Sequence, residues 1–266
     1  MTVIRSIVFQ ILLYVLTAAT LLLTAPVYFF LGHTGRMGVV RWLAQACVWL
    51  TRYVAGIDYE VRGAENLPKE PALVASMHQA MWETFAFVPL FPDPAFVIKS
   101  EMKMVPVWGQ FAAAVEMIFV DRSKGRAALK EMAKGVQAAI AGGRHVVIFP
   151  EGRRIPPGEA SDIKSGITYL YRLSGVPVVP VALNSGFYWG RQTLLKRPGR
   201  IIVEFLPAIP PGLSNEAFQA AFGGAIDAAA DRLILEADRT RPRPHFPPSA
   251  EARLRVLKGS EPQGAA

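Results

Sequence analysis

The chain has 266 residues, of which 52% are hydrophobic, and a formal net charge of +8 at pH 7. This length accommodates one sizeable domain with an additional element, and the positive charge favours an anionic partner such as nucleic acid, a lipid surface or a phosphorylated small molecule. The single cysteine excludes an internal disulfide framework. Cys47 lies in an apolar segment and is better interpreted as a packing residue than as a nucleophile.

An apolar run at residues 7–31 is interrupted only by Gln10 and a few threonines. About 25 residues are enough to cross a hydrocarbon core of roughly 30 Å, so we expect a retained membrane helix. The alternatives are a helix buried in the core and a cleaved signal peptide, which would have a shorter apolar core and a cleavage site of small residues. Pro26 leaves open whether the segment spans the membrane or re-enters it.

The next segment, residues 36–54, has apolar residues at helical spacing on one face and arginines on another. Trp42, Trp49 and Tyr53 are aromatic residues of the kind that gather at membrane–water interfaces. The pattern predicts a helix that lies in the headgroup region, or an ordinary amphipathic helix packed on the soluble domain. We therefore interpret residues 1–55 as two membrane-anchoring helices.

From residue 57 onward, short apolar runs alternate with segments of helical periodicity. The expected strands are 58–61, 72–76, 95–98, 117–120, 145–149, 178–182 and 201–206. The expected helices are 82–90, 106–114, 125–141, 163–173 and 215–238. This alternation predicts an α/β domain over residues 56–238, in which helices cover a sheet.

The last 28 residues, 239–266, are basic and have little apolar periodicity. Their first ten residues contain Pro242, Pro244, Pro247 and Pro248. Such a composition predicts a tail that is mostly disordered.

Charged side chains follow four of the expected strands at the point where each strand ends. They are His78 after 72–76, Lys99 after 95–98, Arg122 after 117–120, and Glu151, Arg153 and Arg154 after 145–149. Ligands of open α/β sheets bind at the carboxyl ends of the strands. The guanidinium group of an arginine can bind two phosphate oxygens at once, in a bidentate arrangement. We therefore expect transfer chemistry on a hydroxyl of a phosphorylated substrate. The alternatives are that Arg122 is a solvated charge and Glu151 an acid at a helix start.

His78 and Glu83 are five residues apart, where an apolar run gives way to a predicted helix. On one continuous helix their side chains would point about 140° apart. They meet only if His78 lies in the loop and Glu83 lies one turn into the helix. The carboxylate would then hold one ring nitrogen and leave the other to accept a proton. The alternative is a surface histidine beside an unrelated acid.

Four blocks of the sequence, in order, resemble those of the glycerolipid acyltransferase family. They are H-x4-D/E at His78 to Glu83, G-x-x-F-x-x-R at 116–122, F-P-E-G-T-R at 149–154, and a Pro-bearing strand at 176–182. Lys99 and the pair Lys164 and Gly166 fit further lysine-bearing segments of the family. Order and spacing match over roughly residues 70–185, and four blocks in order are far more specific than any one of them.

Three positions depart from the family pattern. Glu116 replaces the glycine of the second block, which alters the approach to Phe119. Arg153 replaces the threonine of the third block, so that Arg154 takes the position of the family arginine. Glu83 stands where aspartate is commoner.

The resemblance implies a mixed sheet covered by helices. It also implies transfer of a fatty acyl chain from acyl-CoA or acyl-carrier protein to the free hydroxyl of lysophosphatidate. His78 would act as general base, with Glu83 fixing its tautomer. The residues that would position the substrate are Arg122, Glu151, Gly152, Arg153 and Arg154, with Lys99 or backbone amides at the oxyanion. The implied location is the cytoplasmic membrane, with the site on the cytoplasmic side.

Other functions remain open from the sequence. The alternative acceptors are another lysolipid and glycerol 3-phosphate, since the blocks do not separate these. A non-catalytic module that binds anionic lipids is disfavoured by the intact pair of His78 and Glu83. A hydrolase is disfavoured because G-x-S-x-G and H-E-x-x-H are missing, and nucleic-acid binding would not explain the apolar N-terminal segment. No nucleotide cofactor or metal is expected.

Overall fold

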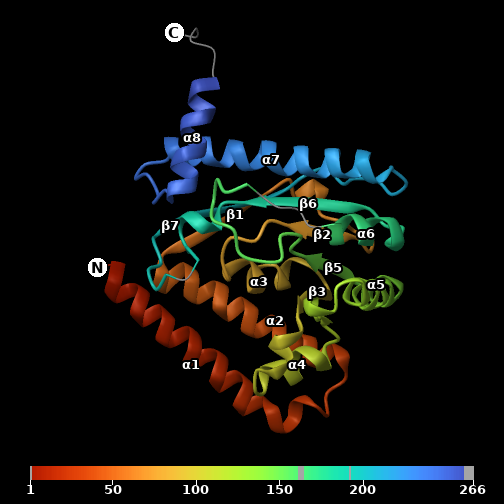
Figure 1. Ribbon diagram of the computed structural model, residues 1–266. Coiled ribbons are helices and arrows are strands. Elements are labelled where there is room, and N and C mark those ends of the chain that lie inside the picture. Colours follow the sequence, from red (N-terminus) through yellow and green to blue (C-terminus); the bar gives the residue numbers. More distant parts are fainter. Residues whose placement is uncertain (1, 161–164, 192, 261–266) are drawn as a thin grey trace.

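The computed structural model describes residues 2–160, 165–191 and 193–260. At its centre lies a seven-stranded sheet with the order β1-β7-β6-β2-β5-β3-β4 (Figure 1). The strands are β1 (Ile57–Arg62), β2 (Leu73–Ser76), β3 (Pro94–Lys99), β4 (Ile118–Val120), β5 (His145–Ile148), β6 (Val178–Leu183) and β7 (Gly199–Phe205). Neighbouring strands are parallel except β6 and β7, which are antiparallel. The mixed sheet and its seven expected strands are thereby confirmed.

Helices cover both faces of the sheet. On one face lie α1 (Thr2–Tyr28), α2 (His33–Leu50), α3 (Trp82–Ala86) and α4 (Trp108–Ala114). On the other face lie α5 (Arg126–Ala141), α6 (Ser165–Ser174) and α7 (Asn215–Arg239), as Figure 1 shows for α7. Side chains alternate between the faces along each strand. Val74 and Val147 therefore pack toward α1 and α2, whereas Leu73 and Val146 pack toward α5 and α7.

Helix α1 is long and apolar enough to cross a membrane, judged by length and composition, with a mean hydropathy of 2.2 in its most apolar stretch. One strip of the helix, which includes Phe9 and Leu13, is buried in the protein. Both ends of the helix are bonded to the α/β fold, because Ser6 Oγ accepts the backbone N–H of Lys196 (2.9 Å) and Tyr28 Oη donates to the Phe111 carbonyl (3.1 Å). The apolar helix suggests membrane association, and it lies along the fold rather than extending away from it.

Helix α2 packs on the α/β fold, which confirms the second expectation for its segment. A position in the headgroup region stays a prediction. Cys47 and Leu50 are buried against the sheet, while the side chains of Trp42, Trp49 and Tyr53 are more than half exposed. Burial raises the pKa of the Cys47 thiol to about 12, so this residue has the properties of a packing residue. One face of α2 therefore packs on the fold. The outward face of α2 and of the turn that follows it carries the exposed side chains of Trp42, Trp49 and Tyr53.

The expected boundary at residue 55 coincides with the end of a π-helical turn, Thr51–Ala55. Gly56 follows with a left-handed φ of 77°, and β1 begins at the next residue. Helices α1 and α2 share one hydrophobic core with the sheet. The division into an anchoring unit and an α/β domain at this point stays a prediction.

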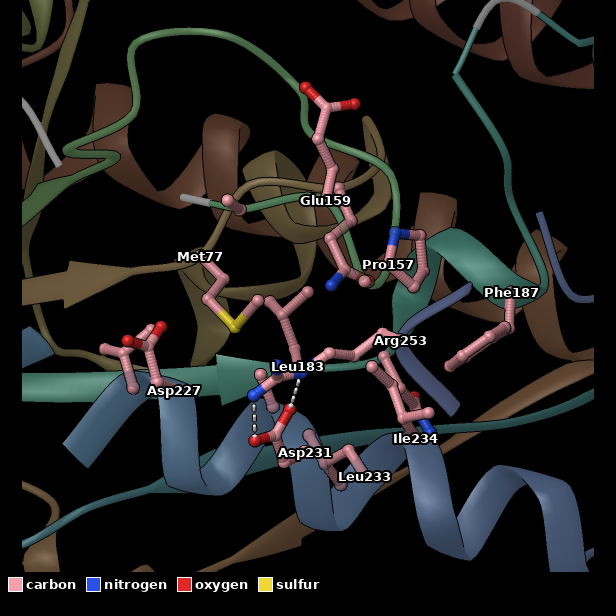
Figure 2. Close-up of a pocket in the computed structure, with 16 residues that line it drawn as sticks. Met77, Pro157, Glu159, Leu183, Phe187, Asp227, Asp231, Leu233, Ile234 and Arg253 are labelled. Atoms are coloured by element: carbon pink, nitrogen blue, oxygen red, sulfur yellow. Dashed lines mark hydrogen bonds and ion pairs between the residues drawn. The ribbon is translucent and has the colours of Figure 1, made fainter. Parts of the chain in front are cut away.

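The expectation of a disordered tail is wrong for residues 248–260, which form helix α8 (Pro248–Ser260). Arg253 donates two hydrogen bonds to the Asp231 carboxylate on α7, at 2.8 and 2.6 Å (Figure 2). Phe246 packs on Phe187 with 4.7 Å between ring centroids. Pro248 occupies the first helical position, where its missing N–H would have no helical partner in any case. Residues 261–266 lie outside the described residues.

Helix α8 also holds the loop that follows the third sequence block. Ser249 Oγ donates to the Pro157 carbonyl at 2.7 Å. Gly158 has a left-handed φ of 78° and lies so close to α8 that a Cβ would stand 2.6 Å from the Cα of Ala250. The loop, α7 and α8 enclose a cavity of about 260 Å³ (Figure 2). Both the backbone conformation and the contact with Ala250 therefore require glycine at position 158.

Replacing Gly158 by alanine should detach α8 from the loop. We expect Gly158→Ala to lower the free energy of unfolding by about 1–3 kcal/mol, because the new Cβ meets backbone atoms and strains φ. Gly224→Ala on α7 is the matched control, since a Cβ there meets nothing within 4 Å. The control should be neutral or stabilise by up to about 1 kcal/mol. Thermal unfolding in detergent measures both, and equal effects would contradict the close contact.

Candidate active site

The charged residues that follow strands β2, β3, β4 and β5 lie at one edge of the sheet. These four strands are mutually parallel neighbours in the order β2-β5-β3-β4. Their carboxyl ends therefore point the same way and bring His78, Glu151, Lys99 and Arg122 to the same edge. The expected convergence is confirmed.

The pairing of His78 with Glu83 depends on a change of structure between them. Strand β2 ends at Ser76, a loop carries His78, and α3 begins at Trp82, so that Glu83 lies in the first helical turn. His78 Nδ1 lies 3.1 Å from Glu83 Oε1, which confirms the contact expected from the spacing. The histidine side chain is 16% exposed and the glutamate side chain is 0% exposed.

The carboxylate of Glu83 accepts hydrogen bonds from four donors. Oε1 accepts from His78 Nδ1 and from the backbone N–H groups of Gln79 (2.6 Å) and Ala80 (2.7 Å). Oε2 accepts from Ser185 Oγ at 3.0 Å. An ionised carboxylate only accepts, so the proton of the imidazole lies on Nδ1 and the lone pair on Nε2. Within the described part of the chain no hydrogen bond is made to Nε2, which leaves this nitrogen available to a substrate.

Residues of the third sequence block and Ile155, which follows it, hold the main chain of His78 and one face of its ring. The buried Glu151 carboxylate accepts the backbone N–H of His78 at 2.8 Å. The backbone N–H of Ile155 donates to the His78 carbonyl at 2.7 Å. Phe149 stacks on the imidazole with 4.2 Å between ring centroids and 22° between planes. The position of the ring is therefore determined by its main chain, by Glu83 and by one aromatic face.

Arg122, which follows β4, contacts the third sequence block. Its Nη1 donates to the Gly152 carbonyl. Gly152 has a left-handed φ of 70°, and a Cβ at this position would collide with the Arg122 guanidinium. Desolvation lowers the pKa of Arg122, and the nearby Glu101 carboxylate raises it. Arg122 remains a cation, because an arginine pKa lies far above neutral pH.

The other sequence-predicted residues have different surroundings. Arg153 forms an ion pair with Glu159 at 2.7 Å, and both side chains are substantially exposed. The Arg154 carbonyl accepts a hydrogen bond from Arg191, and Lys99 is exposed at the end of β3. Among the described residues, no hydrogen bond or ion pair joins Lys99, Arg153 or Arg154 to His78 or Glu83. Lys164 lies outside the described residues.

Ser185 and the side chain of Gln79 are site residues that the sequence did not reveal. Ser185 follows β6, which is parallel to β2, and its hydroxyl reaches Glu83 across 102 residues of chain. Gln79 Oε1 accepts the backbone N–H of Gly186 at 3.0 Å and joins the same two segments. The one available signal was that Ser185 also follows a strand end.

Glu116, which replaces a family glycine, has a left-handed φ of 56°. This conformation costs a side-chain residue more than glycine. The Glu116 side chain is 73% exposed and lies 3.5 Å from Arg144 Nη1. The substitution therefore acts on the backbone before β4, and the glutamate side chain itself points to solvent.

A mainly apolar cavity of about 310 Å³ lies between α1, α2, α3 and α4. Phe149 and Met81 form part of its wall, and Phe149 also stacks on His78. The cavity therefore reaches the Phe149 ring that stacks on the imidazole, and it extends from there toward α1 and α2. It is large and apolar enough to hold part of an alkyl chain.

Comparisons with known proteins agree with this arrangement. The protein-family model "Acyltransferase" matches residues 58–184. The 1-acyl-sn-glycerol-3-phosphate acyltransferase of Pseudomonas aeruginosa is 40% identical over 205 residues, which are 75% of this chain and 79% of that protein. The yeast (Saccharomyces cerevisiae) protein of the same name is 30% identical over 57% of this chain and 51% of its own length.

A solved structure shows the same fold. The crystal structure of the 1-acyl-sn-glycerophosphate (LPA) acyltransferase from Thermotoga maritima aligns with a TM-score of 0.72 at 19% identity. The alignment covers 88% of this chain and 98% of that chain. The histidine–carboxylate pair at the carboxyl edge of this sheet lies within the residues that the acyltransferase family model matches. The chain belongs to the acyltransferase family.

The hydroxyl of Ser185 should support acyl transfer through Glu83. We expect Ser185→Ala to lower kcat about tenfold with little change in KM, because one buried carboxylate oxygen loses a donor worth about 1–1.5 kcal/mol. Ser185→Thr should restore part of the rate. Ser174→Ala is the control, since that hydroxyl donates to the Tyr171 carbonyl of its own helix and to no other residue that the structure describes. Steady-state kinetics measure the effect, and a change confined to KM would contradict this role.

Proposed function

We propose that this chain is a 1-acyl-sn-glycerol-3-phosphate acyltransferase, which moves a fatty acyl chain to the free hydroxyl of lysophosphatidate and forms phosphatidate. The identity with the Pseudomonas aeruginosa protein of that name supports this acceptor. The observation that carries the chemistry is the geometry of His78, whose Nδ1 is held by a buried carboxylate while Nε2 is unoccupied.

In the proposed reaction, His78 Nε2 accepts the proton of the substrate hydroxyl while that oxygen attacks the thioester carbonyl. Glu83 stabilises the imidazolium that forms. The C–S bond then breaks, the new ester is released, and the proton passes from the imidazolium to the departing thiolate. No enzyme nucleophile is required. Cys47, the single cysteine of the chain, is buried and has a pKa of about 12, which keeps it protonated at neutral pH.

The phosphate of the acceptor would bind to Arg122 and Arg154. Arg122 lies against the third block beside His78, and Arg154 takes the position of the family arginine. We assign Glu151 a positioning role, because its carboxylate is buried against the backbone N–H of His78. Gly152 contributes by leaving room for Arg122. Arg153 is engaged by Glu159 and is not required in this arrangement.

The acyl chain would occupy the apolar cavity between α1, α2, α3 and α4. The donor would be a thioester, either acyl-CoA or acyl-carrier protein, and the thioester chemistry is the same for both. We infer that α1 lies in one leaflet, because both of its ends are bonded to the fold. The net charge of +8 supports the cytoplasmic side, where anionic lipids attract basic proteins.

Replacing His78 should abolish the reaction. We expect His78→Ala to reduce phosphatidate formation at least about 10³-fold, because the general base is lost. The assay uses detergent-solubilised protein with lysophosphatidate and an acyl-CoA, and the product is measured by mass spectrometry. His33→Ala is the control, because His33 also pairs with a carboxylate, that of Asp93 at 2.7 Å, but lies at the start of α2. Activity that survives in His78→Ala would overturn the mechanism.

Removing the proposed phosphate ligand should weaken acceptor binding. We expect Arg122→Ala to raise KM for lysophosphatidate about 10- to 100-fold, which corresponds to a charge-assisted hydrogen bond of about 1.5–3 kcal/mol. The KM for the acyl donor should not change. Arg153→Ala should change either KM by no more than about twofold, because its ion pair is exposed. If Arg122→Ala changed the KM for lysophosphatidate as little as Arg153→Ala does, the phosphate would be bound elsewhere.

A further inference from the structure

We propose that the loop between β6 and β7 is a second membrane-contact element. In this proposal Leu194 inserts into the lipid surface, and Arg191 and Arg197 contact anionic headgroups. We call residues 193–198 the Leu194 loop. The proposal depends on the membrane association suggested by α1 and is independent of the acyl-transfer chemistry.

The Leu194 loop holds its apolar side chain outward by an unusual internal bond. The Leu194 side chain is 70% exposed, whereas the neighbouring Lys196 is 2% exposed. Lys196 Nζ donates to the carbonyls of Thr193 (2.9 Å) and Leu194 (3.2 Å), and it lies 4.9 Å from the centroid of the Trp189 ring. Burial lowers the pKa of Lys196 to about 8. A buried lysine is therefore used to fix the turn, and leucine is left at its tip.

The same loop is fixed to the N-terminal end of α1. Ser6 Oγ accepts the backbone N–H of Lys196 at 2.9 Å, while its hydroxyl donates within α1 to the Thr2 carbonyl at 2.7 Å. Phe9 packs edge-on against Trp189 with 5.3 Å between ring centroids. In Figure 1 the loop, in teal, comes down beside the first turns of α1. The exposed apolar residues of those turns include Ile4 and Ile7, so both of the joined segments carry exposed apolar side chains at this end of α1.

The charge around Leu194 matches a lipid surface. Residues 184–200 contain four basic residues and no aspartate or glutamate. Lys196 is buried and Arg200 lies 3.6 Å from Glu60, which leaves Arg191 and Arg197 as the cations beside Leu194. Helix α1 also has no acidic residue. An apolar tip with basic neighbours is the pattern of interfacial membrane contacts, because the apolar group enters the acyl boundary while the cations meet phosphates. The attachment of the loop to α1 commits the partner to a bilayer that contains anionic lipid.

The loop also connects this surface with the active site. Arg191 Nη1 donates to the Arg154 carbonyl at 3.4 Å. Arg154 is one of the two proposed phosphate ligands. Lipid held at the Leu194 loop would therefore lie next to the segment that receives the acceptor headgroup.

Site-specific fluorescence tests the insertion directly. Single cysteines are introduced into the full chain with Cys47→Ala as background, and each is labelled with the environment-sensitive dye NBD. Leu194→Cys is the test position, Ile11→Cys on the exposed face of α1 is the positive control, and Leu213→Cys before α7 is the control on the opposite side of the sheet. The proteins are mixed with vesicles of phosphatidylcholine and phosphatidylglycerol.

At position 194 we expect a blue-shifted emission and at least about threefold less quenching by aqueous iodide on vesicles, as at position 11, because the dye enters the acyl boundary. Position 213 should stay accessible to iodide. If position 194 behaves like 213 while 11 is protected, the loop does not insert and the proposal is wrong. If position 11 is also accessible, α1 does not dock on the bilayer and the proposal falls with it.

A kinetic test separates this proposal from the proposed reaction. Leu194→Asp should lower acyl transfer about fivefold when lysophosphatidate is embedded in anionic vesicles, because a charged tip opposes insertion. The same variant should match wild type when a short-chain lysophosphatidate is supplied in detergent. An unchanged rate on vesicles, or an equal loss with both substrates, would contradict a membrane role. Absence of activity in wild type would count against the proposed function alone, since the fluorescence result stands without catalysis.

Discussion

The buried carboxylate of Glu83 is the constraint on which the catalytic edge depends. Burying a charge costs several kcal/mol unless hydrogen bonds replace its water. The donors come from the loop after β2, at Gln79 and Ala80, and from Ser185 after β6. Strands β2 and β6 pair in parallel, with Ser76 opposite Val181, so both segments leave the sheet at the same edge. The sheet order is thus what allows a fully buried anion at this position.

A second set of contacts makes His78 independent of the substrate for its orientation. Its ring is held by Glu83 and Phe149, and its main chain by Glu151 and Ile155. Phe149, Glu151 and Ile155 lie after β5, whereas Glu83 lies in the first turn of α3. Segments from different parts of the chain must therefore be in place together. A proton acceptor that is already oriented requires no reorganisation when the reaction begins. The rigidity of the edge is therefore part of the chemistry that we propose for it.

The features predicted correctly from the sequence are those that depend on near neighbours. The seven strands are short apolar runs, and the contact between His78 and Glu83 requires only a loop that becomes a helix within five residues. Ser185 was missed because its partner lies 102 residues away, and no local pattern marks a hydroxyl that reaches a distant carboxylate. The same limit applies to α8, because its hydrogen bonds to Asp231 and the contact of the preceding Phe246 with Phe187 are long-range.

Glu151 and Arg153 illustrate why residue type alone did not show which charged residues contact His78. Both are charged, both belong to the third block, and they are two residues apart. Gly152 turns the chain between them, with a φ of 70°, so that Glu151 is buried against His78 while Arg153 meets Glu159 at the surface. Burial is decided here by one glycine, and the linear sequence does not show toward which side the chain turns.

The polarity of the molecule is divided at His78. On one side Phe149 leads into the apolar cavity under α1 and α2, and on the other side Arg122 lies at the charged edge of the sheet. A lysolipid has the same division, because an alkyl chain and a phosphate flank the hydroxyl that reacts. In the proposed mechanism the base lies at the boundary between the two environments, and this position would favour an amphiphilic substrate. The exposed apolar face of α1 would bring the same boundary to the lipid, so membrane docking and substrate selection would depend on one gradient of polarity.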